Sequence, residues 1–135
     1  MQALSRRAFG TMTLGALLAA PFARAQPAGG TDMAIDEGLF VDINGVEQWI
    51  TIRGRDRRNP VLLLLHGGPG FPMSFMAPAF ASWEREFTLV QWDQPGGGPT
   101  YLKNRAHGQG PLNIERFVTD GIAVTEWVRS HLHSQ

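Results

Sequence analysis

The sequence contains one short motif whose residue types and spacing suit a catalytic or binding role, His66-Gly67-Gly68-Pro69-Gly70. These five residues directly follow the apolar run 61–65, which predicts a β-strand. A strand that ends in consecutive glycines places backbone N–H groups at the carboxyl edge of a sheet, where open α/β sheets bind their ligands. Such an N–H group could form part of an oxyanion hole, which stabilises the charge that develops on a carbonyl oxygen by about 3 to 4 kcal/mol per donor.

Two other uses of the same residues compete with an oxyanion hole. Phosphate binding is one, but the glycine spacing does not fit G-x-G-x-x-G and lacks the G-K-[ST] ending of a P-loop. Pro69 also removes one of the backbone donors that a phosphate cradle would use. The other alternative is a plain glycine and proline turn without a chemical role. We expect an oxyanion loop, with these two alternatives open.

The elements that position this loop follow from the pattern on either side of it. Two β-rich segments, 39–43 and 47–52, flank Asn44-Gly45 and predict a hairpin. The uninterrupted apolar run 61–65 predicts a strand buried on both faces, and therefore a central parallel strand. Residues 74–86 have a loosely helical spacing, and 87–92 predict the next strand, so the segment forms a β-α-β unit.

A glycine- and proline-rich loop, 95–111, precedes the last predicted element. Asn113 could cap a helix there. The apolar face of that helix would consist of Ile114, Phe117, Val118, Ile122, Val124 and Val128. Hairpin, strand, helix, strand and helix in this order predict an α/β sheet. His131 and His133 are two residues apart on the helix and point to different faces, so we expect a frayed, solvated end there and no metal site.

The first loop, together with residues 93–100 (D-Q-P-G-G-G-P-T), resembles the paired signature of α/β-hydrolases in the proline iminopeptidase family. The resemblance covers about 39–135 and also includes the order and spacing of the two motifs. It implies an α/β fold, the incomplete N-terminal part of an α/β-hydrolase sheet, with a hairpin followed by parallel strands and crossover helices. Lipase-type esterases have HGGG at the first loop and epoxide hydrolases HG-x-P, so Gly68 with Pro69 favours the iminopeptidases.

The resemblance also implies a role for each matching residue. The N–H of Gly68 is the expected oxyanion donor, and the residues that shape its loop are His66, Gly67, Pro69 and Gly70. The second active-site loop comprises Asp93, Gln94, Gly96 and Gly98. His66 braces the loop and is not the catalytic base, and Asp93 is structural and not the triad acid. Pro95 departs from the family pattern, which usually has arginine there, and Pro99 stands where a small or charged residue is commoner.

The catalytic triad is absent from the sequence. An α/β-hydrolase needs a serine on a G-x-S-x-G elbow, then an acid, then a histidine. No serine of the chain has glycines at both of those flanking positions. We therefore expect the chain to stop short of the elbow and to be inactive alone. The complete protein would be a serine hydrolase that releases an N-terminal residue, with proline as one candidate, from small peptides.

Two alternatives to the peptidase stay open. The first is an esterase or amidase that acts on a small ester or amide substrate, because a shared fold does not fix the substrate. The second is a non-catalytic remnant or a binding module. No motif in the sequence implies a cofactor or a metal.

The first 25 residues predict an export signal. Arg6 and Arg7 precede an apolar stretch, 10–22, and a small-x-small site that ends at Ala25. The stretch is too short for a permanent membrane span, which needs roughly 20 apolar residues. The paired arginines resemble a bacterial twin-arginine signal. We expect recognition by the twin-arginine export machinery, cleavage after Ala25, and a periplasmic or extracellular protein.

Composition sets the remaining boundaries. Hydrophobic residues make up 43% of the 135 and charged residues 18%, which suits one folded domain. Three of the 12 basic residues precede Gln26, whereas all 12 acidic residues follow it. The body is therefore mildly acidic, which excludes the basic footprint of a nucleic-acid-binding protein. We expect a signal over 1–25, a flexible linker over 26–38 and the hydrolase part over 39–135.

Overall fold

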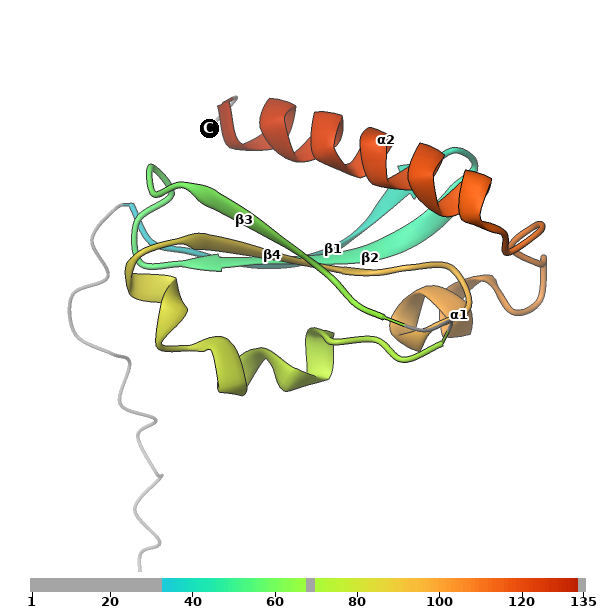
Figure 1. The fold of residues 1–135 in the computed structure, drawn as a ribbon, viewed down its shortest axis with the longest axis horizontal. Helices are drawn as coiled ribbons and strands as arrows, with labels where there is room; N and C mark the ends of the chain where they lie inside the picture. The colour runs from blue at the N-terminus through green and yellow to red at the C-terminus, as the bar shows by residue number, and fades with distance from the viewer. Residues whose placement is uncertain (1–32, 68–69, 134–135) are drawn as a thin grey trace, which may run out of the picture.

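The computed structural model describes residues 33–67 and 70–133 (Figure 1). The predicted signal, the first part of the predicted linker, and Gly68 and Pro69 lie outside the described residues. The elements in chain order are β1 (Ile35–Ile43), β2 (Val46–Gly54), β3 (Val61–Leu65), the 3-10 helices η1 (Ser74–Phe80) and η2 (Trp83–Arg85), β4 (Thr88–Asp93), α1 (Gly98–Asn104) and α2 (Ile114–His133).

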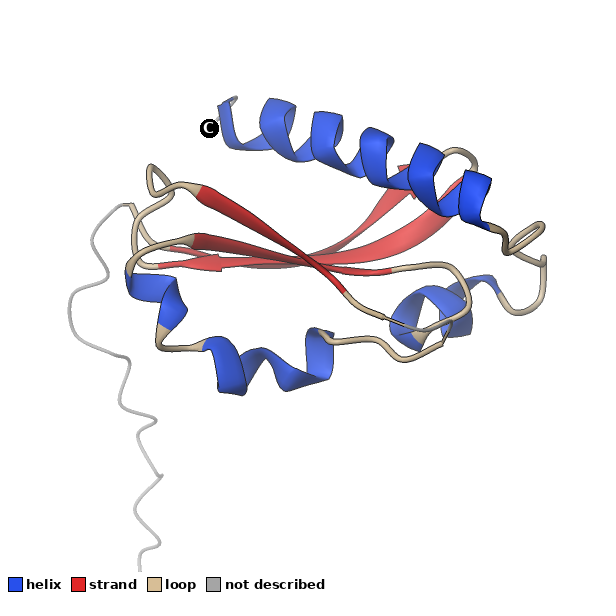
Figure 2. Ribbon diagram, viewed as in Figure 1, coloured by secondary structure: helices blue, strands red, loops and turns tan. Residues whose placement is uncertain are grey.

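One four-stranded sheet forms the middle layer of three. Its strand order is β1-β2-β4-β3, with β3 parallel to β4 and the other neighbours antiparallel. Helix α2 crosses one face, whereas η1, η2 and α1 lie against the other (Figure 2). The mixed α/β architecture predicted from the element order is therefore present.

The predicted hairpin is present, but it begins earlier than expected. Asn44 and Gly45 both have positive φ, 52° and 82°, as a tight two-residue turn requires. Strand β1 starts at Ile35, so the predicted linker 26–38 extends too far and the predicted start at residue 39 is wrong. Ile35 is buried and pairs with Gly54. The start of the strand could not be recognised from the sequence, because the residues that follow Ile35 are polar and lie on an edge strand of the sheet.

Strand β3 pairs in parallel with β4, as predicted. The prediction that β3 is a central strand is wrong for the part of the chain that the structure describes. There it lies at the sheet edge, and Leu65 is 62% exposed. The segment after it also differs from the expectation, because residues 74–86 form two 3-10 helices and no α-helix. Pro78 lies inside η1, where it removes a backbone donor. The predicted loop 95–111 contains one further helix, α1.

Helix α2 begins as predicted and covers the core. The side chain of Asn113 accepts a hydrogen bond from the N–H of Arg116 at 2.8 Å, which caps the first turn. Val124 and Val128 are buried against the sheet with Ile50, Ile52, Val90 and Trp92. The rest of the predicted apolar face does not join them, because Ile114, Val118 and Ile122 are more than half exposed. The helix therefore has one apolar face in the core and a second on the surface.

A buried polar cluster fixes α2 to the hairpin. The carboxylate of Asp120 is fully buried and accepts hydrogen bonds from Asn44 (2.7 Å), Gln48 (2.8 Å) and Arg116 (2.8 Å). The side-chain oxygen of Gln48 accepts the indole N–H of Trp92 at 2.6 Å. The buried carboxylate is thus paired with one positive charge and two amide donors where α2 crosses β2 and β4, although Nη2 of Arg116 is buried without a hydrogen-bond partner in the described part of the chain.

The end of α2 also differs from the prediction of a frayed, solvated end. The Nε2 atom of His131 lies 2.6 Å from Oε2 of Glu37 on β1, and its ring stacks on Trp127 with 4.6 Å between centroids. These contacts dock the last turn on the first strand. In the described segments no group of three potential ligands could hold a metal ion, and no helix could cross a membrane.

Candidate active site

The two glycine-rich loops meet at the carboxyl ends of β3 and β4. Leu65 pairs with Trp92 across these parallel strands, so the backbone leaves both strands at the same edge of the sheet. A Cβ atom on Gly70 would lie 3.1 Å from the carbonyl oxygen of Gly96, and one on Gly97 would lie 3.3 Å from Cα of Gly70. The backbones of the two predicted loops are therefore in direct contact.

His66 joins the loops by two hydrogen bonds. Its Nε2 atom accepts the backbone N–H of Gln94 at 3.1 Å, and its carbonyl oxygen accepts the side-chain amide of Gln94 at 3.2 Å. The side chain is 5% exposed. Because Nε2 accepts a hydrogen bond, the neutral ring carries its proton on Nδ1. An imidazole held in this way cannot take a proton through Nε2 without losing the contact with the second loop.

Asp93 is fully buried and forms hydrogen bonds to the segments that follow the two loops. Its carboxylate accepts the Ser74 hydroxyl at 2.5 Å and the Ser74 N–H at 3.3 Å, which fixes the start of η1. Its carbonyl oxygen accepts the Thr100 hydroxyl at 2.5 Å, and that hydroxyl accepts the N–H of Trp49 at 2.8 Å. Thr100 is the last residue of the predicted second motif. Its hydrogen bonds, and the role of Ser74, could not be predicted, because a single hydroxyl in a loop or a short helix carries no periodic signal.

The second loop requires glycine at particular positions. Gly96 has φ of 92° and donates its N–H to the side-chain oxygen of Gln109 at 2.8 Å. Gly98 has φ of 49°, and a Cβ atom there would lie 2.7 Å from Oδ2 of Asp93 and 2.9 Å from the Pro72 ring. Pro95, which directly precedes Gly96, is fully buried. The loop is therefore shaped by close backbone approach, as a pre-organised hydrogen-bonding edge would need.

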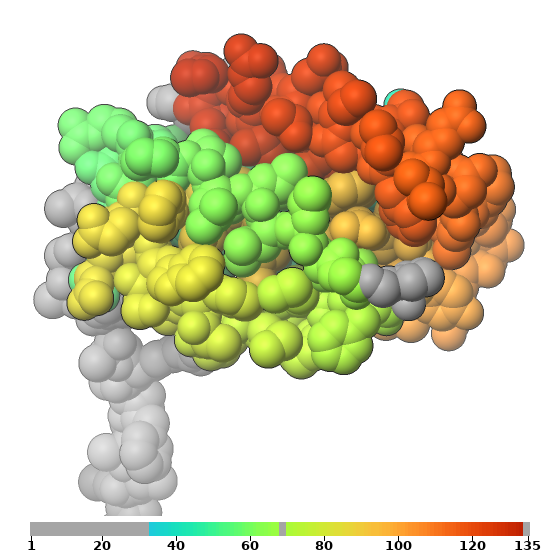
Figure 3. Space-filling view, viewed as in Figure 1, coloured from blue at the N-terminus to red at the C-terminus, as the bar shows by residue number. Residues whose placement is uncertain are grey.

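An apolar groove of about 630 Å³ runs beside the candidate site, between β3 and α2. Leu65 and Gln94 line its end near the loops, and the exposed apolar face of α2 lines its side. Figure 3 shows β3 at the front of the molecule, with α2 above it and η1 below it.

Comparison with known proteins places this geometry in context. No family model matches the chain. The chain is 39% identical over 92 residues to the probable aminopeptidase YbaC of Bacillus subtilis, a match that covers 67% of the chain and 28% of the relative. A crystal structure of a proline iminopeptidase-related protein from Thermus thermophilus is similar, with a TM-score of 0.54 and 22% identity. That match covers 70% of the chain and 32% of the solved protein.

The described residues form a mixed α/β fold. Their mixed α/β sheet resembles the structure from Thermus thermophilus and is consistent with part of an α/β-hydrolase. At 22% identity this likeness concerns the fold alone. The chain spans less than a third of the length of either protein, so the activity of a complete protein is a matter for proposal.

Proposed function

We propose that the chain is the N-terminal part of a serine hydrolase of the proline iminopeptidase type, which releases an N-terminal residue from small peptides. The observation that carries the proposal is the contact between the two glycine-rich loops at the carboxyl ends of β3 and β4. Similarity to a probable aminopeptidase supports the peptidase class over other hydrolases.

In this proposal the N–H of Gly68 stabilises the oxyanion of the tetrahedral intermediate. Gly67, Pro69 and Gly70 shape the loop, and His66 and Gln94 hold it against the second loop. The nucleophilic serine, its base and its acid belong to a later part of the complete protein, which forms and then hydrolyses an acyl-enzyme.

The experiment begins with the coding DNA downstream of Gln135. An in-frame strand followed by G-x-S-x-G would identify the complete protein, which is then assayed with proline arylamide and with a short-chain aryl ester. Release of the arylamine supports the peptidase. Turnover of the ester alone would replace it with an esterase. A stop codon without an elbow in any frame would leave a non-catalytic remnant.

We further propose that residues 1–25 direct twin-arginine export to the periplasm or the medium. The support is the order of Arg6-Arg7, the apolar stretch and the small residues that end at Ala25. The mature protein should begin at Gln26 when its N-terminus is sequenced. Replacing both arginines with lysine should retain the precursor in the cytoplasm, whereas unchanged export would exclude this route.

A further inference from the structure

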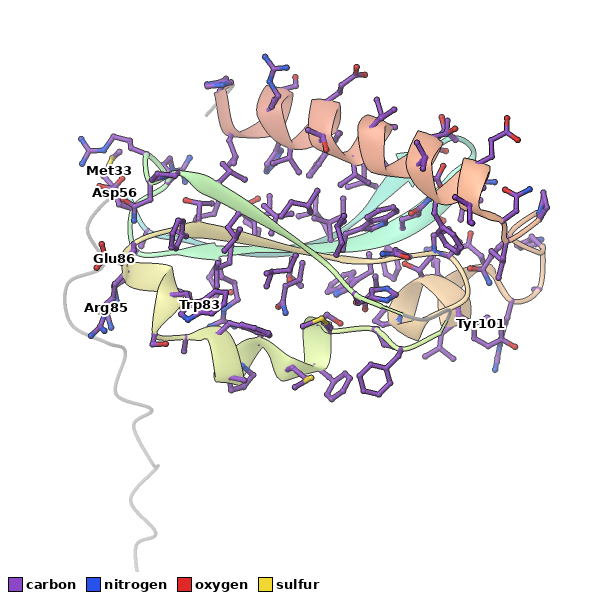
Figure 4. All side chains as sticks on the ribbon, in the orientation of Figure 1. Met33, Asp56, Trp83, Arg85, Glu86 and Tyr101 are labelled. Carbon is purple, nitrogen blue, oxygen red and sulfur yellow. The ribbon has the colours of Figure 1, made fainter. Side chains whose placement is uncertain are left out.

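The second glycine-rich loop begins with a tight turn. The N–H of Gly97 donates to the carbonyl oxygen of Gln94 at 3.2 Å, which closes a four-residue β-turn. Pro95 occupies the second position of this turn, and Gly96, with φ of 92°, occupies the third. Proline followed by a glycine with positive φ is the pattern of a type II turn. The turn leads from β4 into α1, and Figure 4 marks this end of the sheet by Tyr101 of α1.

The residues of the turn do not by themselves select type II. Types I and II differ chiefly in the orientation of the peptide unit between their second and third residues. Proline is favoured at the second position of both types, and glycine adopts negative φ as readily as positive φ. The orientation of the peptide unit between Pro95 and Gly96 therefore depends on contacts from outside the turn.

The side chain of Gln109 makes such a contact. Its Oε1 atom accepts the N–H of Gly96, which belongs to this central peptide unit, at 2.8 Å. A reversal of the peptide unit would turn the N–H away from Gln109 and break the bond. The hydrogen bond therefore stabilises the type II form relative to type I.

The loop that carries Gln109, 105–112, is itself anchored. Gly108 and Gly110 have φ of 76° and 72°, so the backbone bends sharply on both sides of Gln109. A Cβ atom on Gly110 would lie 3.3 Å from Nη1 of Arg116, so the loop packs closely against α2. Gln109 thus connects the turn to the helix that covers the core.

The turn also touches the first glycine-rich loop. A Cβ atom on Gly70 would lie 3.1 Å from the carbonyl oxygen of Gly96. Leu112 packs on the same glycine, because a Cβ atom on Gly96 would lie 2.9 Å from its Cδ1 atom. A change of turn type reverses the sign of φ at Gly96 and so moves its carbonyl oxygen. The turn type and the contact with Gly70 are therefore coupled.

We propose that Gln109 is a positioning residue, which holds the turn 94–97 in its type II form and thereby keeps the second loop in place against Gly70. The inference rests on the proposed function and adds to it a residue outside both glycine-rich motifs. Gln109 acts through Gly96 and Gly70 on the loop that stabilises the oxyanion, and such stabilisation depends on pre-organised geometry.

The test uses the complete protein and three single variants. Gln109→Met keeps the length of the side chain but removes the amide oxygen, whereas Gln109→Glu keeps an oxygen acceptor. His107→Ala is the matched control, because His107 lies in the same loop and is exposed.

The first readout is hydrogen exchange of the Gly96 N–H by NMR, which needs no substrate. Loss of one hydrogen bond should make this exchange about 3- to 10-fold faster in Gln109→Met. Gln109→Glu and His107→Ala should exchange as slowly as the unaltered protein.

The second readout is kcat and KM for proline arylamide, measured without urea, where each variant is folded. Removal of an oxyanion donor lowers kcat about 100- to 1000-fold. A displaced donor should cost part of this, so we expect kcat of Gln109→Met to fall about 10-fold, with KM changed by less than about 2-fold. Gln109→Glu should recover most of kcat, and His107→Ala should keep it.

The opposite results would overturn the proposal. Unchanged exchange in Gln109→Met would mean that the bond does not hold the turn, and unchanged kcat would mean that the turn does not position the chemistry. A rise in KM alone would assign Gln109 to substrate binding. Equal losses in Gln109→Glu or His107→Ala would assign the effect to the loop as a whole.

Failure of the proposed function is distinguishable from failure of this inference. If the unaltered protein cleaves no arylamide, the proposed function fails, and with it the catalytic consequence of the turn. Exchange of the Gly96 N–H is then still measurable. Faster exchange in Gln109→Met would support the role of Gln109 in the turn, and unchanged exchange would overturn it.

Discussion

Replacing Gly98 with alanine should destabilise the protein more than replacing Gly108. Both glycines have positive φ, 49° and 76°, so alanine at either position would adopt a left-handed backbone, which lowers the free energy of unfolding by about 1 to 2 kcal/mol. The surroundings differ. A Cβ atom on Gly98 would meet Asp93 and Pro72, whereas nothing lies within 4 Å of one on Gly108.

The additional cost at Gly98 follows from the rigidity of its neighbours. The carboxylate of Asp93 is buried and held by Ser74, and the Pro72 ring cannot rotate away. Insertion of a methyl group into a packed site typically costs about 1 to 3 kcal/mol. We therefore expect a loss of about 2 to 5 kcal/mol for Gly98→Ala and about 1 to 2 kcal/mol for Gly108→Ala.

Urea unfolding followed by tryptophan fluorescence measures the difference. With a slope of about 1 to 3 kcal/mol per molar, the two midpoints should differ by about 1 M. Equal midpoints for the two variants, or a Gly98→Ala protein as stable as the unaltered one, would refute the close contact between the loops. Any gain from a stiffer unfolded chain is shared by both variants and cancels.

Three further predictions concern the rest of the molecule. Asp120→Ala should lower the free energy of unfolding by about 3 kcal/mol, because it removes the buried carboxylate and leaves Asn44, Gln48 and Arg116 without the acceptor of their hydrogen bonds. The exposed Glu115→Gln control should stay within about 0.5 kcal/mol in the same urea titration. Hydrogen bonds from Arg58 lower the pKa of Asp56 from 3.8 to about 2, so this carboxylate stabilises the fold above about pH 4 and less as the pH falls toward 2. Arg58→Met should raise that pKa in an NMR titration, and an unchanged value would contradict the pairing. We expect the exposed apolar face of α2 to make the chain self-associate in sedimentation, and Ile122→Glu, which places a charge on that face, should reduce this association.

The sequence predicts those parts of the fold that have a local or periodic signal. Asn44-Gly45 marks the hairpin because both residues accept positive φ, and Asn113 marks the start of α2 because its side chain can accept a backbone N–H. The limits of β1 lack such a signal. Polar residues after Ile35 hide the alternation that would have revealed the strand.

Apolar periodicity alone could not show which face of α2 enters the core. Val124 is buried and Ile122 is exposed, although both are apolar and only two positions apart. The choice is made by Asp120, whose buried bonds to the hairpin set the rotation of the helix. Such long-range partners, here more than 70 positions apart, leave no pattern in a local window of sequence.

The same contacts bear on the roles that are proposed for His66 and Asp93. Histidine and aspartate side chains can serve as base and acid, but here both side chains accept hydrogen bonds that hold the loops. His66 uses Nε2 to accept the N–H of Gln94, and Asp93 uses its carboxylate to hold Ser74. These bonds accompany a close backbone approach between Gly70 and the glycines of the second loop, Gly96 and Gly97. In the proposed hydrolase this edge contributes oriented N–H groups, and the proposal assigns the nucleophile, base and acid to other residues.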